Sequence, residues 1–226
     1  MSLEGFHEEF VAVGKKLGDD DALSKYGAVL WSLERAPNVG LELAEEEQRL
    51  GMEGDVPAPF GCLDQELLQA RRGLLSMNRG RFATESVVRY LHASGDLLGQ
   101  LARTTLLRHT DLTESCGVQD VLAAVKRETE LVEVAKSFEA FLASPAYRFA
   151  ADASNRMKHR DWMPFRQWGR LAEDGRVESG SEVGPFEHAG RSHGEVDLRA
   201  LRSHTNQLEE LGAETVGAIL AAADRP

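Results

Sequence analysis

One segment near the middle of the chain carries polar side chains at helical spacing. The positions fall at i, i+4, i+7 and i+11, so a helix would present them on one face. In chain order they are Arg148, Asp152, Asn155 and His159. A cation, a carboxylate, an amide and an imidazole on one face could position a phosphate or polarise a hydroxyl, since histidine titrates near neutral pH.

Two further basic residues, Lys158 and Arg160, flank this stripe. We take His159, Asn155 and Lys158 as candidate catalytic residues. Arg148, Asp152 and Arg160 are candidate ligand-binding residues. The alternative is a surface ion pair between Arg148 and Asp152, one turn apart, with a structural histidine beside it.

A second polar stripe is expected earlier in the chain, on a long helix. It comprises Glu85, Arg89, His92, Asp96, Gln100 and Arg103. His92 and Asp96 are one turn apart, so the carboxylate could orient the imidazole, and both are candidate ligand-binding residues. This stripe faces either the first one or water.

Known motifs for metals and common cofactors are missing from the sequence. His188 and His193 stand beside Glu187 and Glu195, but no spacing typical of a metal site joins them. Glycine-rich phosphate loops and the Gly-x-Ser-x-Gly motif are also missing. We therefore expect no metal and no cofactor.

Apolar periodicity predicts the helices that must position these residues. Their approximate ranges are residues 3–17, 21–35, 41–52, 64–77, 83–109, 118–143, 145–161 and 196–223. Ala36-Pro37-Asn38 and Asn78-Arg79-Gly80 are expected to end helices. Ser144 is expected to cap the helix that begins at Pro145.

Residues 162–194 differ in character, with two tryptophans, six glycines and two prolines. Asp174-Gly175 suggests a hairpin turn there. The predicted fold is mainly α, an antiparallel helical bundle with a small irregular or β-hairpin insertion, at about 162–194, before the last helix. Residues 1–55 would form an acidic helical appendage and residues 56–226 the bundle.

The net charge of −11 is unevenly distributed. Residues 1–66 carry −10, residues 67–172 carry +5 and residues 173–226 carry −6. The acidic total disfavours general nucleic-acid binding, whereas the basic middle leaves room for a local anion-binding face. The isolated cysteines Cys62 and Cys116, the absence of a long apolar run and the acidic N-terminus predict a cytoplasmic protein that does not enter membranes.

The segment Asn155-Arg156-Met157-Lys158-His159-Arg160 resembles an Asn-x-x-Lys-His-Arg pattern of HEPN-like helical proteins. Ser144-Pro145-Ala146-Tyr147 resembles the start of the same helix in that family. The stretch from Tyr90 to Leu98, with Asp96, resembles its earlier long helix. The resemblance covers roughly residues 80–226.

This resemblance implies a protein that acts as a homodimer, and many relatives cut RNA in toxin–antitoxin or defence systems. Their usual signature is an arginine, four to six residues and a histidine. Arg156 is too close to His159 for that spacing, and Arg148 is too far. We therefore expect a non-catalytic module that binds RNA, a nucleotide or a protein partner. The alternatives are a metal-independent ribonuclease and a purely structural protein-interaction module.

Overall fold

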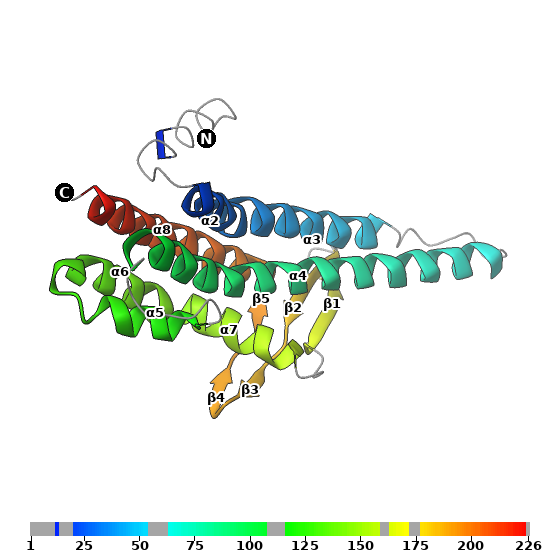
Figure 1. Cartoon of the computed structure of the whole chain (residues 1–226). Helices are drawn as coiled ribbons and strands as arrows, with labels where there is room; N and C mark the ends of the chain where they lie inside the picture. Colours follow the sequence, from blue (N-terminus) through cyan, green and yellow to red (C-terminus); the bar gives the residue numbers. More distant parts are fainter. Residues whose placement is uncertain are drawn as a thin grey trace. The chain divides into compact units, whose positions relative to one another are not determined.

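The computed structural model describes residues 12–13, 20–53, 63–107, 116–158, 163–171 and 177–224. Within these ranges the chain is mainly helical, and a small set of antiparallel strands precedes the last helix (Figure 1). The predicted fold class is confirmed in both respects. No helix among the described residues is long and apolar enough to cross a membrane. The predicted boundary near residue 55 lies outside the described residues and stays a prediction.

The chain forms two compact units. The first comprises residues 1–35, 90–148 and 205–226, and the second comprises residues 36–89 and 149–204. Three helices contribute residues to both units: α4 (Leu63–Leu106), α7 (Pro145–Lys158) and α8 (Leu198–Ala223).

The first unit also contains α2 (Asp20–Leu30), α5 (Val118–Val125) and α6 (Val132–Ala143), and α5 packs against α6 (Figure 1). The prediction of one helix over residues 118–143 is wrong, because a 3-10 turn, Thr129–Leu131, separates α5 from α6. Residues 126–130 are all polar and exposed, so a helix continued through them would have no apolar side chain to bury there.

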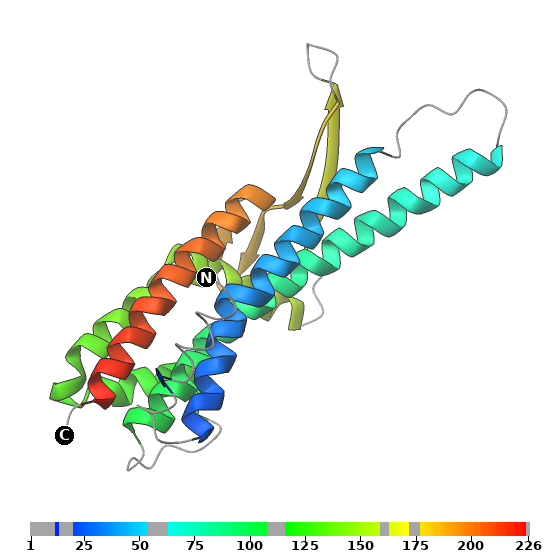
Figure 2. The ribbon, with the colours of Figure 1, turned by 90° about the horizontal axis from the view of Figure 1, so that it is seen from above.

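In the second unit, α3 (Ala36–Glu53) runs alongside the first part of α4 (Figures 1 and 2). A Cβ atom on Gly40 would lie 2.6 Å from Val87 Cγ2, so glycine permits a close approach of the two helices. Further along α3, Ala44 packs with Ala83 and Leu198. The residue numbers run in opposite directions on the two helices, which makes the pair antiparallel.

Two predicted helix ends are wrong. The chain stays helical through Pro37, with a π-helical turn over Trp31–Arg35 between α2 and α3. The wider turn accommodates proline, whose ring would clash with the carbonyl four residues earlier in a regular α-helix. Helix α4 continues through residues 78–80, because an interior glycine costs a helix only about 1 kcal/mol.

Among the described residues that precede α8, the insertion contains five short strands. They are β1 (Phe165–Leu171), β2 (Val177–Val183), β3 (Phe186–His188), β4 (Arg191–His193) and β5 (Val196–Asp197). β2 pairs antiparallel with β1 and with β5, and β3 pairs antiparallel with β4. The predicted pairing on either side of Asp174-Gly175 is therefore confirmed. Asp197 then caps α8, since its Oδ1 accepts the N–H of Ala200 at 2.6 Å.

Candidate functional site

Helix α7 begins as the sequence predicts. Ser144 Oγ accepts the backbone N–H of Tyr147 at 3.1 Å, which satisfies a donor of the first turn that has no partner within the helix. Pro145 follows at the first helical position. The position of this start sets which side chains of α7 lie on its buried face, and these include Phe149, Ala150 and Ala153.

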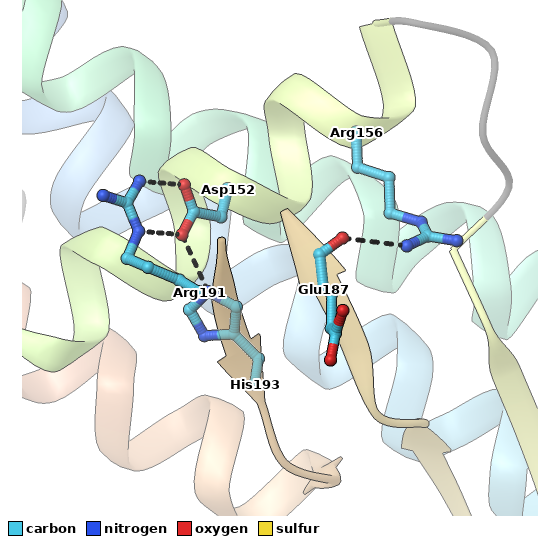
Figure 3. A network of polar contacts seen from close by, with 5 residues as sticks. All are labelled: Asp152, Arg156, Glu187, Arg191 and His193. Atoms are coloured by element: carbon cyan, nitrogen blue, oxygen red, sulfur yellow. Dashed lines mark hydrogen bonds and ion pairs between the residues drawn. The ribbon is translucent and has the colours of Figure 1, made fainter. Parts of the chain in front are cut away.

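Asp152 lies on the same helix and is bonded to two residues of the strand insertion (Figure 3). Its Oδ2 accepts from Arg191 Nε at 2.7 Å, and its Oδ1 accepts from Arg191 Nη2 at 2.5 Å. His193 Nε2 lies 2.8 Å from Oδ2 and carries the proton if the carboxylate is ionised, since such a carboxylate only accepts. The Asp152 side chain is 1% exposed, that of His193 14% and that of Arg191 54%.

Two opposing effects act on the pKa of Asp152. Burial raises it, because a charged carboxylate loses its water. The hydrogen bonds and charges of Arg191 and His193 lower it by more, so the pKa of Asp152 lies below its ordinary value. The same contact raises the pKa of Arg191. The group is therefore an ionised carboxylate held by two donors near neutral pH.

The β3–β4 hairpin explains why both donors reach one carboxylate. Ala189 (φ 48°) and Gly190 (φ 76°) both have positive φ, as a two-residue hairpin turn of type I′ requires. Arg191 and His193 are two residues apart on β4 and therefore point to the same side. Across the hairpin, Glu187 pairs with Ser192 and accepts a hydrogen bond from its Oγ at 3.2 Å, on the opposite side.

Aromatic rings enclose the His193 end of the network. The Phe186 ring is stacked on His193 with centroids 4.7 Å apart, and Phe149 meets the same imidazole edge-on at 5.8 Å. Phe149 also lies 5.4 Å from the ring of His204 on α8, whose pKa is lowered by burial. Both histidines are therefore packed as part of an apolar cluster.

Arg156, one turn after Asp152, makes a second contact with the hairpin (Figure 3). Its Nη1 donates to the carbonyl of Glu187 at 3.1 Å, and its guanidinium lies 5.9 Å from the centre of the Phe186 ring. Its Nε is buried and has no hydrogen-bond partner among the described residues. Helix α7 and the hairpin are thus joined at two successive turns.

This arrangement is better suited to holding side chains in place than to catalysis. A carboxylate beside an imidazole can serve general acid–base catalysis when the other ring nitrogen reaches a substrate. Here the His193 ring is only 14% exposed and lies between Phe186 and Phe149. The contacts instead fix Arg191, whose side chain is half-exposed and whose Nη1 takes no part in the bonds to Asp152.

Of the residues predicted on this stripe, the structure joins Asp152 to the insertion. Asn155 is half-buried, Lys158 is exposed, and Arg148 is exposed in the first unit. His159 and Arg160 lie outside the described residues. Their catalytic and ligand-binding roles stay predictions.

The other predicted pair, His92 and Asp96, lies in the first unit. The His92 ring is 6.2 Å from the ring of Tyr147. Burial raises the pKa of Tyr147, and the negative charge of Asp96 raises it further. Asp96 itself is exposed and lines a pocket with residues of α5.

Arg191 was not predicted from the sequence, and His193 was considered only as a metal ligand. The residues on either side of the Ala189-Gly190 turn alternate in a way that places four side chains on one face of a hairpin: Phe186, His188, Arg191 and His193. Nothing in the spacing indicates that Asp152, about forty residues earlier, is the partner of that face.

Comparisons with protein-family models, curated proteins and solved structures give no match.

Proposed function

We propose that this chain is a non-catalytic, HEPN-like helical module that binds single-stranded RNA through the end of α7 and the strand that follows. The observation that carries the proposal is the composition of residues 154–170. This stretch has five Lys or Arg residues and one Asp, in a chain with a net charge of −11. It also contains Trp162, Phe165 and Trp168. Cations bind phosphates, and aromatic rings stack with unpaired bases.

Exposed cations in the second unit support this proposal. Lys158 is exposed in the last turn of α7, and Arg166 is exposed on β1. Asp152 holds the half-exposed Arg191, which lowers the conformational entropy that this arginine would lose on binding a phosphate. Glu187 and Glu195 are exposed on the same insertion, and their carboxylates repel phosphates. We therefore expect a short RNA site whose affinity depends markedly on the salt concentration.

The absence of catalysis is the second part of the proposal. His159 has no arginine at the spacing of the catalytic HEPN-like proteins, and His204, which has Arg199 at that spacing, is packed against Phe149. In the contact between α7 and the β3–β4 hairpin, the buried carboxylate of Asp152 is bonded to Arg191 and His193, and His193 is covered by aromatic rings.

Binding is best tested by fluorescence anisotropy with a labelled single-stranded oligouridylate at several salt concentrations. Replacing both Lys158 and Arg166 by alanine should weaken binding and reduce the salt slope by about 1.4, since each contact to a single strand contributes about 0.7. The matched control replaces Arg127 and Lys136, two exposed cations of the first unit. Equal affinities for the two double variants would contradict the proposal.

Catalysis is tested by incubating the purified protein with mixed RNA, with and without a chelator. We expect no cleavage. Chelator-resistant cleavage that is lost in His159→Ala would replace the proposal by a metal-independent ribonuclease. The variant that replaces both Lys158 and His159 by alanine should stay folded by circular dichroism, and unfolding would make this stripe structural.

We also propose that the protein is a cytoplasmic homodimer. Three large apolar side chains of the packed helices α3 and α4 are exposed: Val39 (58%), Leu43 (48%) and Phe82 (62%). Exposed apolar groups of this kind are frequent at protein interfaces. Light scattering after size exclusion should give the dimer mass, and Phe82→Glu should give the monomer. A monomeric wild type would refute this part.

A further inference from the structure

A second candidate site lies in the first unit and shares no residue with those assigned to RNA. It is a pocket of about 290 Å³ between one face of α4 and the start of α5. From α4 it is lined by Asp96, Gly99, Gln100 and Arg103, and from the α5 side by Cys116, Gly117, Val118 and Val121. The α4 residues are spaced at i, i+3, i+4 and i+7, so they share one face.

Part of the pocket lining is apolar. Gly99 and Val121 are buried. A Cβ atom on Gly99 would lie 3.4 Å from Val118 Cα, so α5 begins within van der Waals reach of α4.

Opposite charges stand at the two ends of the α4 face. Asp96 and Arg103 are two turns apart, which is about 10 Å along the helix axis. Neither residue makes an ion pair with another residue that the structure describes. The Gln100 amide, a donor and an acceptor, lies between them in sequence.

We infer that this pocket binds a small linear zwitterion, with its ammonium group at Asp96 and its carboxylate at Arg103. A simple anion would be repelled by Asp96, and a simple cation by Arg103. Arginine binds a carboxylate through two parallel hydrogen bonds. The separation of the two charges favours a ligand whose ammonium and carboxylate are several bonds apart. The volume is at the small end for ligand pockets and fits a ligand of roughly ten non-hydrogen atoms.

The probe that matches these requirements is ε-aminocaproate, tested by isothermal titration calorimetry on the full chain. Caproate and hexylamine have nearly the same carbon chain and one charge each, and we expect both to bind at least about tenfold more weakly. Asp96→Asn and Arg103→Gln should each weaken ε-aminocaproate by about tenfold. Arg103→Lys, which keeps the charge, should retain part of the affinity, and Arg127→Gln, outside the pocket, should retain all of it.

Cys116 provides a second measurement, since this residue lines the pocket. Saturating ε-aminocaproate should slow alkylation of Cys116 by iodoacetamide, read by mass spectrometry, while the rate at Cys62 stays unchanged. The inference is overturned if ε-aminocaproate binds no better than its singly charged analogues. It is also overturned if folded Asp96→Asn binds like the wild type, or if Cys116 is not protected. These outcomes leave the RNA proposal untouched, because no residue is shared.

Discussion

Replacing Asp152 by asparagine tests whether the contact between α7 and the β3–β4 hairpin stabilises the protein. Asparagine keeps the shape of the side chain but removes its charge, and it offers one accepting oxygen where the carboxylate offers two. Asp152 accepts three short hydrogen bonds, two from Arg191 and one from His193. At least one of these bonds must therefore be lost, and the others become weaker.

The expected magnitude follows from how exposed the two partners are. A hydrogen bond to a charged group is worth about 1.5–3 kcal/mol, against about 1 kcal/mol for a neutral one. The His193 side chain is 14% exposed, so the free energy of its hydrogen bond to Asp152 counts nearly in full. The Arg191 side chain is 54% exposed, and water can replace the carboxylate as its partner. The contacts of Arg191 therefore contribute at most about 1 kcal/mol to the free energy of unfolding. We expect Asp152→Asn to lower the free energy of unfolding by about 2 kcal/mol.

The assay is urea unfolding followed by circular dichroism near neutral pH for the wild type, Asp152→Asn, Arg191→Gln and the double variant. Residues in direct contact are not additive, so the cycle should give a coupling free energy of about 1 kcal/mol. The slope of the free energy against urea concentration should be the same in all four proteins.

The pH dependence gives an independent check. The folded-state pKa of Asp152 is depressed, so its contribution is present above the unfolded value, near about 4, and is lost as the pH falls through the folded value. The gap between the wild type and Asp152→Asn should be constant above about pH 5 and shrink below about pH 4. A coupling free energy near zero, or a gap that persists in acid, would refute the reasoning.

Three other predictions concern His204, the glycines Gly95 and Gly217, and Ser144. Burial lowers the pKa of His204, so the unfolded chain binds the proton first and stability decreases as the pH falls below about 6.5. In thermal melts at several pH values, His204→Gln should flatten this decrease. Parallel curves of stability against pH for the two proteins would contradict the prediction. A Cβ atom on Gly95 would lie 2.6 Å from Tyr147 ring carbons, whereas one on Gly217 meets open space. In urea titrations, Gly95→Ala should lower the free energy of unfolding by about 1–3 kcal/mol, and Gly217→Ala should raise it by about 0.5–1 kcal/mol. Similar values for the two variants would count against this packing. Ser144→Ala should cost about 1 kcal/mol in the same titrations and Ser144→Asp much less, unless the cap contributes nothing.

The sequence alone determined the features that depend on local chemistry. The apolar period predicted the helix over residues 83–109, and Val87, Leu91 and Leu98 within it are fully buried. The Ser144-Pro145 pair placed the start of α7, and the change of composition after residue 161 marked the strand insertion. These signals lie within a few residues of their effect, so neighbouring residues are sufficient to read them.

Tertiary structure decided the features that compete with local preference. Pro37 and Gly80 each oppose a helix by about 1–3 kcal/mol, and the helices nevertheless continue past both residues. The partners of Asp152 were also set at this level, because a carboxylate on a helix face is compatible with any nearby donor. The strand period predicts that Arg191 and His193 point to one side of the hairpin, but it does not predict that this side contacts Asp152 on α7.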